Sequence, residues 1–231
     1  SSVSREIGIA ASGYLARTIQ SDDVIGISWG STLNEMVEDL EPINLPNVHV
    51  VQIIGGLGRP ESEMHATDLC RRLSKRINCK MTLLPAPGIV DDQSTRLVFL
   101  SDSHVQNAIS LFSKVKLAFV GIGAPSPDSV VMRDGSILKQ SEVDELQKKG
   151  AVGDIALRYF DSYGQLVSTE LDQRVIGMSP HELSNVESVV GVAGGPQKIE
   201  AILGALRGQL IDVLITDHAT AKGLIEKDSK N

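Results

Sequence analysis

Two short stretches combine glycine with hydroxyl or amine side chains in a pattern suited to binding an anion. The first is Ser28-Trp29-Gly30-Ser31-Thr32, which follows an apolar run and precedes a helical pattern. Gly30 lets the backbone approach a ligand, while Ser31 and Thr32 would present hydroxyl and N–H groups at a helix N-terminus, where anions bind. The stretch predicts a phosphate cradle, although a serine that only caps the helix would give the same letters.

The second stretch is Gly194-Gly195-Pro196-Gln197-Lys198, a glycine turn with proline in the first turn of another predicted helix. Lys198 would reach a phosphate or a sugar carbonyl from this position, although most helical lysines are solvated surface charges. A buried lysine with a lowered pKa would also form a Schiff base with an open-chain sugar. The sequence leaves that alternative open.

Two further polar residues are candidates for contacts with the hydroxyl groups of a ligand. Asp154 follows Gly153 at the base of a predicted hairpin. A carboxylate there would accept hydrogen bonds from a sugar, or it would simply cap a turn. His65, on the helix predicted after Gly55-Gly56, would donate to a phosphate or hydroxyl, but a lone helical histidine more often packs or faces solvent.

Motifs for catalysis or metal binding are weak in this sequence. The stretch Gly26-Ile27-Ser28-Trp29-Gly30 matches the GxSxG nucleophile elbow of α/β-hydrolases. The acid and histidine that should follow it are poorly matched, because His218 lies at the head of the last predicted helix. Phosphate-loop, dinucleotide and zinc-ligand spacings do not occur. We therefore expect no catalytic residue, no metal ion and no cofactor.

A parallel sheet would bring these stretches together, and the hydrophobic pattern predicts one. Short apolar runs that end at a glycine or small polar residue, each followed by a helical pattern, are typical of strands buried on both faces. We expect strands at 23–28, 48–54, 81–84, 117–122, 189–192 and 213–215, and a small antiparallel hairpin from 154–160 and 165–167 around a turn at 161–164. Loops at the carboxyl ends of parallel strands meet at one edge of the sheet, where ligands bind.

Composition restricts the class of protein. The chain has 231 residues, of which 42% are hydrophobic, enough for a sizeable core in one compact unit over 1–231. A net charge of -7 argues against this segment tracking a nucleic-acid backbone. Two cysteines without CxxC spacing favour a reducing, cytoplasmic setting. The sequence lacks a signal pattern and an apolar stretch long enough for a membrane, and without a first methionine it is expected to be a fragment of a longer protein.

Six ordered stretches together resemble the sugar-binding domain of the SorC/DeoR-type transcription regulators, the family of the sorbose-operon regulator. They are residues 26–32, 55–56, 121–123, 150–155, 192–198 and 214–217, so the resemblance covers essentially the whole chain. It implies an α/β fold, a Rossmann-like parallel sheet covered by helices on both faces with a small antiparallel hairpin insertion. Similar folds occur in the glucosamine-phosphate deaminase, ribose-phosphate isomerase and CoA-transferase group.

The resemblance also implies a function and a site. Relatives hold phosphate and sugar hydroxyls at the positions that correspond to Gly30, Ser31, Thr32, Asp154 and Lys198, and some place a polar contact at His65. A sugar or sugar-phosphate effector would then modulate operator DNA binding by a dimer or tetramer through an N-terminal helix-turn-helix domain that this chain lacks. We expect no enzymatic activity; a sugar-phosphate isomerase or deaminase of the same fold, with Asp154 as general base, is the alternative.

Overall fold

The computed structural model describes residues 2–57, 66–125 and 138–229. Its helices are α1 (Ser2–Thr18), α2 (Ser31–Asp39), α3 (Ala66–Ile77), α4 (Gln93–Ser101), α5 (Ser103–Ile109), α6 (Gln140–Lys148), α7 (Pro180–Ser184), α8 (Ile199–Arg207) and α9 (His218–Asp228), with 3-10 turns η1 (Phe112–Lys114), η3 (Glu170–Gln173) and η4 (Pro196–Lys198). Its strands are β1 (Val24–Ile27), β2 (His49–Gln52), β3 (Lys80–Thr82), β4 (Leu117–Val120), β5 (Gly153–Ile155), β6 (Arg158–Phe160), β7 (Ser188–Val192) and β8 (Val213–Ile215).

The main sheet has six strands in the order β3-β2-β1-β4-β7-β8, and every neighbouring pair is parallel. The chain builds outward from β1 to β3 in one direction and from β4 to β8 in the other. The strand order therefore reverses between β1 and β4, which is the position where parallel sheets of this kind open a crevice for ligands. All six predicted strands are confirmed: β8 has the predicted bounds, β7 begins one residue earlier, β3 is shifted by one to two residues, and β1, β2 and β4 are shorter than their apolar runs.

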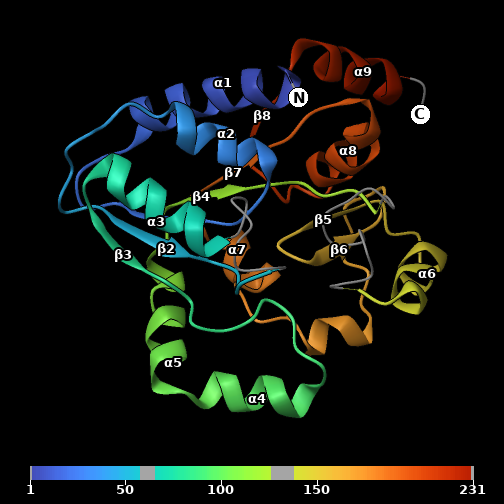
Figure 1. The fold of residues 1–231 in the computed structure, drawn as a ribbon. Coiled ribbons are helices and arrows are strands. Elements are labelled where there is room, and N and C mark those ends of the chain that lie inside the picture. The colour runs from blue at the N-terminus through green and yellow to red at the C-terminus, as the bar shows by residue number, and fades with distance from the viewer. Residues whose placement is uncertain (1, 58–65, 126–137, 230–231) are drawn as a thin grey trace.

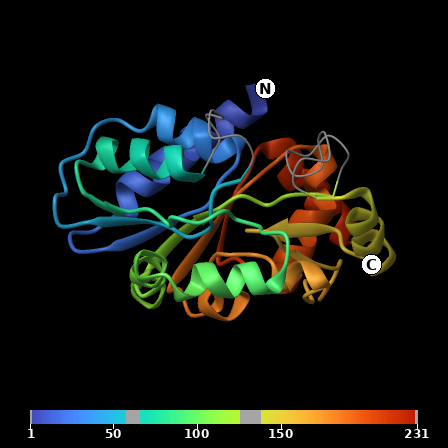
Figure 2. The same cartoon turned by 60° about the horizontal axis from the view of Figure 1, so that its bottom comes forward.

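Helices cover both faces of the sheet, as expected. On one face, α1, α2 and α3 pack in a core with alternate strand residues such as Ile25 and Ile27. The other face holds a second core, in which α5, α8 and the β5–β6 hairpin pack against residues such as Val120 and Val189. Figure 2 shows the same two layers after rotation, with α4 and α5 on the side opposite α1 to α3.

Helix α3 shows how the sequence specifies these layers. Leu69, Leu73 and Ile77 recur every four residues and are fully buried, so they form one stripe against the sheet. Asp68 lies in the first turn and Lys75 in the last, each where it complements the helix dipole. In the described part of the chain, no helix has the length and apolarity needed to span a bilayer.

The hairpin is present, but its turn lies earlier than predicted. The sequence suggested one strand over 154–160, whereas the structure folds β5 back onto β6 through Ala156 and Leu157, which have φ values of 51° and 63°. Non-glycine residues seldom adopt this left-handed conformation, so no sequence signal marked the turn. The predicted turn at 161–164 also forms, and there Phe160 and Leu166 make one isolated antiparallel bridge.

Candidate functional site

Helix α2 begins after Gly30, and no side chain caps its N-terminus. Gly30 has φ 142° and ψ 160°, and a β-carbon there would meet nothing within 4 Å. The requirement for glycine therefore comes from the backbone conformation and not from crowding. The first N–H groups of a helix have no intrahelical partner and lie at the positive end of its dipole. Together with the exposed Ser31, they suit an anion at the predicted cradle.

Thr32 is placed differently from Ser31, because its side chain is buried. Its hydroxyl donates a 2.6 Å hydrogen bond to the carbonyl oxygen of Val192, the last residue of β7. The bond fastens the first turn of α2 to the strand that leads to Lys198. The backbone N–H of Thr32 and the lone pairs of its hydroxyl therefore remain for a ligand, but its hydroxyl proton is already used.

The loops after β1 and β4 touch each other at the point where the strand order reverses. The N–H of Gly121 donates to Oγ of Ser28 at 3.2 Å. A β-carbon on Gly121 would lie 2.9 Å from the carbonyl oxygen of Trp29, so only a residue without a side chain fits this approach. The predicted cradle and the 121–123 glycine turn thus form one edge of the crevice.

Asp154 reaches the same crevice from the hairpin. Its backbone exchanges two hydrogen bonds with Gly123, at 2.9 and 3.2 Å, which fixes β5 against the loop after β4. Its carboxylate is buried and Oδ2 accepts the N–H of Leu157 at 3.1 Å. Burial raises the pKa of Asp154 from its ordinary value of 3.8 to about 6, against the opposing effects of the Leu157 N–H and the charge of Lys198.

Lys198 closes the site from the end of η4, where it precedes α8. Burial lowers the pKa of its amine, while the negative charge of Asp154 opposes that change. The charge of each residue therefore influences the pKa of the other, so the two groups are close enough to interact. Within the described ranges, no hydrogen bond or ion pair involves the ammonium group of Lys198, so none of these residues occupies its three donors.

Asp217 and Thr220 hold the loop that carries Lys198, a role that was not predicted from the sequence. The N–H of Gly195 donates to Oγ1 of Thr220 at 2.7 Å and to Oδ2 of Asp217 at 3.3 Å. Asp217 also caps α9 by accepting the N–H of Thr220. Burial alone would raise the pKa of Asp217, but its hydrogen bonds from Thr220 and Gly195 together lower it. The Thr-Asp sequence after an apolar run was the available signal for this cap.

Tyr159 is a second residue that sequence reasoning missed. It is the cross-strand partner of Asp154, and partners in an antiparallel pair project from the same face. Burial raises the pKa of the Tyr159 hydroxyl well above 10, and the negative charges of Asp154 and Glu142 raise it further. Among described residues no group is hydrogen-bonded to this hydroxyl, so it is a further polar group beside Asp154. If the turn had been predicted at Ala156 and Leu157, the pairing of Tyr159 with Asp154 would have followed.

The remaining candidates do not join this cluster. His65 lies outside the described residues, so its predicted role stays a prediction. Ser28, the candidate nucleophile, is buried and accepts the Gly121 N–H, and no histidine of the described residues hydrogen-bonds to it. His49, for example, contacts Thr82 instead, at 2.8 Å. Within the same part of the chain, no group of three or more His, Cys, Asp or Glu residues is arranged to hold a metal ion.

Comparison with known proteins gives consistent matches over most of the chain. The Sugar-bind family model, which describes a sugar-binding domain, matches residues 1–226. The deoxyribonucleoside regulator of Bacillus subtilis (strain 168) is 29% identical over 212 residues, covering 92% of this chain and 67% of that protein. The sorbitol operon regulator of Klebsiella pneumoniae is 31% identical over 216 residues, covering 91% of this chain and 67% of that protein.

A solved structure agrees with this result. The crystal structure of the full-length sorbitol operon regulator SorC from Klebsiella pneumoniae superposes with a TM-score of 0.91 at 28% identity, covering 97% of this chain and 72% of that chain. The chain spans 64% to 67% of the length of the first three curated relatives that it matches.

Proposed function

Because this chain belongs to the Sugar-bind family of sugar-binding domains, we propose that it senses a sugar or sugar phosphate on behalf of a transcription regulator. The observation that carries the proposal is the convergence at one sheet edge of three binding groups. These are the uncapped N-terminus of α2, the buried carboxylate of Asp154 and the largely buried amine of Lys198, which has no partner among the described residues. Relatives named as the deoxyribonucleoside and sorbitol operon regulators support the regulatory role.

The chemistry of these groups suggests how a ligand is held. Carboxylate oxygens of Asp154 accept hydrogen bonds from sugar hydroxyls, with the Tyr159 hydroxyl beside them on the same face of the hairpin. A phosphate binds at the N–H groups of Gly30 to Thr32 and at the ammonium of Lys198. Because burial has already removed water from Asp154 and most of Lys198, bonds to the ligand compensate an existing desolvation cost.

Hydrogen bonds within the protein at this edge link four separate parts of the fold. The bond from Thr32 to Val192 joins α2 to β7, and the pairing of Gly123 with Asp154 joins β4 to the hairpin. A ligand that prefers one arrangement of these parts shifts the protein toward it, and only such differential affinity alters the activity of a regulator. We propose that this shift is transmitted within a dimer or tetramer in the cytoplasm.

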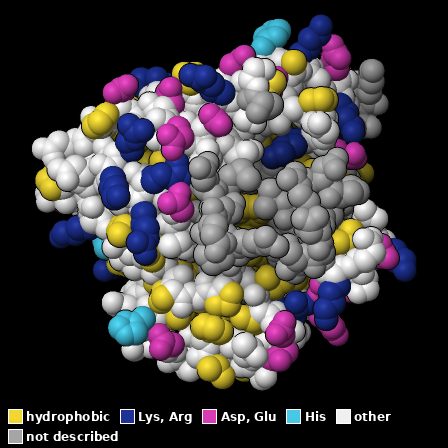
Figure 3. Space-filling view, in the orientation of Figure 1, with side chains coloured by type: hydrophobic (Ala, Val, Ile, Leu, Met, Phe, Trp, Pro, Cys, Tyr) yellow, Lys and Arg dark blue, Asp and Glu magenta, His cyan; other side chains and the backbone are white. Residues whose placement is uncertain are grey.

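We propose that operator DNA is bound by a segment of the full-length protein outside residues 1–231. The net charge of -7 does not suit a surface that tracks phosphates. On the face drawn in Figure 3, the Lys and Arg side chains of the described residues are interspersed with Asp and Glu rather than gathered into a stripe. The relatives are named as regulators, and the match covers only 67% of the length of each.

We also propose that the ligand is bound without being converted. A carboxylate with a pKa of about 6 has the right basicity for a general base, so an isomerase or deaminase activity is the alternative to test. The regulator names of the relatives favour binding alone.

The test is thermal unfolding of this chain with paired free and phosphorylated sugars, including sorbitol, deoxyribose, ribose and fructose. A ligand at 100 times its Kd stabilises by about 2.7 kcal/mol, which raises Tm by roughly 5 to 10 °C for a protein of this size. We expect at least one pair to give such a shift, lost in Lys198→Met and retained in Lys222→Met, an exposed lysine on α9. If no sugar changes the Tm, the proposal is wrong. If a sugar is converted to product, the protein is an enzyme instead.

A further inference from the structure

A separate cavity of about 160 Å³ lies between the β5–β6 hairpin, α7 and the segment 208–212 that precedes β8. Its lining is largely apolar and includes Phe160, Leu183 and Val186, together with two ionisable side chains, Arg158 and Asp212. None of the residues proposed to bind the sugar lines it. An apolar cavity of about 150 Å³ is large enough for a benzene ring.

Arg158 is the unusual member of this lining. Its Nη1 donates to the carbonyl oxygen of Asp172 at 3.1 Å and to Oδ1 of the same residue at 2.9 Å. Its Nε–H is buried and has no hydrogen-bond partner in the described structure. Leaving a charged donor buried and unpaired costs more than about 1–3 kcal/mol, so native proteins rarely tolerate it without a ligand or water.

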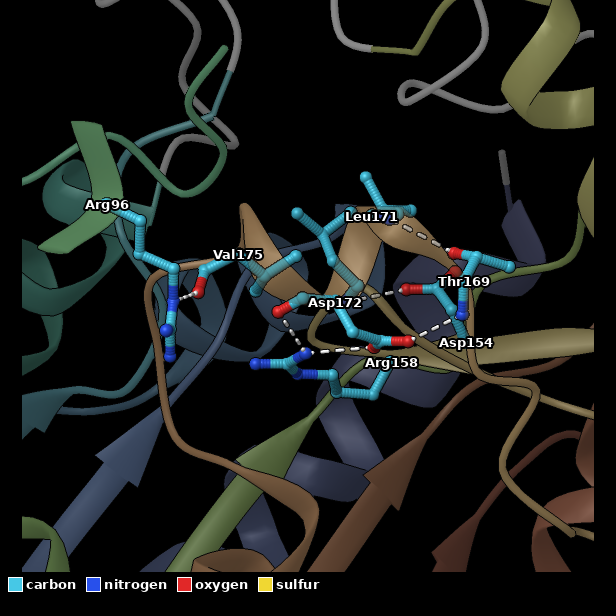
Figure 4. Close-up of polar contacts among 8 residues, drawn as sticks. Arg96, Asp154, Arg158, Thr169, Leu171, Asp172 and Val175 are labelled. Atoms are coloured by element: carbon cyan, nitrogen blue, oxygen red, sulfur yellow. Dashed lines mark hydrogen bonds and ion pairs between the residues drawn. The ribbon is translucent and has the colours of Figure 1, made fainter. Parts of the chain in front are cut away.

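A second arginine adds positive charge beside Arg158. Arg96 reaches from α4 and donates through Nε to the carbonyl oxygen of Val175 at 2.8 Å. Burial lowers the pKa of Arg96, and the positive charge of Arg158 lowers it further. In Figure 4 the two guanidinium ends approach each other beneath Asp172 and Val175. Among described residues, Asp172 alone forms an ion pair with either arginine, so the group keeps a net positive charge.

The other charged side chain of the cavity lies at its mouth. Asp212 is exposed, and its Oδ2 accepts the N–H of Val189 at 2.7 Å. Its charge is thus held at the backbone where β7 begins, and no described ion pair joins it to Arg158. The cavity consequently has an apolar body, with the side chain of Arg158 in its lining and the exposed carboxylate of Asp212 at its rim.

We propose that this cavity is a second ligand site, which takes a small monoanion with an apolar body, such as an aromatic or short aliphatic carboxylate. The carboxylate accepts hydrogen bonds from the guanidinium of Arg158, which lines the cavity, and the ring or alkyl chain fills the apolar space beside Phe160 and Leu183. A sugar does not suit this lining because its hydroxyl groups would find few partners there. A cavity that holds only water is the competing explanation, and it requires no affinity for carboxylates.

Benzoate is the probe for this site, with benzyl alcohol as its neutral counterpart, and the measurement is an isothermal or NMR titration of the whole chain. We expect benzoate to bind at least tenfold more tightly than benzyl alcohol. Arg158→Gln should weaken benzoate binding at least tenfold, and Arg17→Gln, at an exposed arginine of α1, should leave it unchanged. Lys198→Met should also leave it unchanged, which separates this site from the sugar site.

A second variant protects the test against misfolding of Arg158→Gln, which also loses the bonds to Asp172. Ser184 lines the cavity from α7 and is exposed, so Ser184→Trp obstructs the mouth without disturbing the core. We expect it to abolish benzoate binding while the far-UV spectrum and Tm stay close to the wild type. Absence of binding to the wild-type chain, or equal binding of benzoate and benzyl alcohol, overturns the proposal, as does binding that Arg158→Gln and Ser184→Trp leave unaffected.

Discussion

Gly123 and Asp154 exchange a pair of backbone hydrogen bonds, and the Asp154 carboxylate occupies the space where a side chain on Gly123 would begin. A β-carbon on Gly123 would overlap Oδ1 of Asp154. The glycine therefore serves the site by leaving room for the carboxylate, in addition to turning the chain after β4.

Replacing Gly123 with alanine should displace the carboxylate and weaken sugar binding. We expect Gly123→Ala to reduce affinity by about tenfold or more, comparable to Asp154→Ala, because a hydrogen bond to a charged group contributes about 1.5–3 kcal/mol. The double variant should bind no worse than Asp154→Ala alone, since both changes remove the same contact. Fully additive losses in a calorimetric double-mutant cycle would show that Gly123 acts elsewhere.

The Asp154 carboxylate should destabilise the folded protein at neutral pH. The fold raises the pKa of this group from 3.8 to about 6, so the folded protein holds the proton more tightly than the unfolded chain. The resulting stabilisation is complete below about pH 4 and is lost as the pH rises through 6. At pH 7.5, Asp154→Asn should raise the free energy of unfolding by up to about 3 kcal/mol, at 1.36 kcal/mol per pKa unit.

The measurement is urea denaturation of the wild type and Asp154→Asn at pH 4 and pH 7.5. The increase in the free energy of unfolding caused by Asp154→Asn should largely disappear at pH 4. Asp91→Asn, at an exposed position, should change stability little at either pH. A loss of stability at pH 7.5 would mean that the carboxylate has stronger partners than Leu157 N–H and the nearby Lys198 charge.

Gly30 should be replaceable only at a cost to both stability and ligand affinity. Its φ of 142° lies in a region that side chains disfavour, while the space around it is empty. Gly30→Ala should therefore destabilise the fold by about 1–3 kcal/mol or move the α2 N-terminus, and binding should weaken in either case. Gly150→Ala is the matched control, because Gly150 also has positive φ and empty surroundings but follows the C-terminus of α6 instead of preceding α2. It should change stability without changing the affinity of the folded protein.

Ligand affinity should be greatest in the pH range between the titration of Asp154 and that of Lys198. Protonation of Asp154 removes an acceptor for sugar hydroxyls as the pH falls below about 6. Loss of the Lys198 proton removes the cation for phosphate, and its lowered pKa brings this loss to a lower pH than for an ordinary lysine. Calorimetric titrations from pH 5 to 10 should show the alkaline decline in the wild type but not in Lys198→Arg. An unchanged alkaline decline in that variant would assign it to another group.

The pattern of glycines allowed much of the fold to be predicted. Apolar runs that ended at Gly30, Gly121 and Gly194 were strands of a parallel sheet, and their loops do converge at one edge. Local sequence is enough to predict these strands, because a buried strand needs both an apolar run and a residue that allows a tight turn after it. The same reasoning placed Lys198 near this edge, whereas the family resemblance added Asp154; the two charges are close enough to influence each other.

Features that depend on tertiary contacts were not predictable in this way. Ala156 and Leu157 turn the hairpin with positive φ because Leu157 is fully buried and its N–H bonds to Asp154, which only the folded chain provides. The hydrogen bond from Thr32 to Val192 spans 160 residues, and the buried Nε of Arg158 depends on distant neighbours. No short sequence pattern encodes either relationship.

The central claim is that a sugar or sugar phosphate binds at the edge formed by α2, the β5–β6 hairpin and η4. The most direct measurement is the change in backbone amide NMR shifts when the sugar that most stabilises this chain is added. We predict that the largest changes occur at Gly30 to Thr32, Gly123, Asp154 and Lys198, and that they are absent in Lys198→Met. Largest changes at amides remote from this edge, or changes that persist in Lys198→Met, would contradict the account.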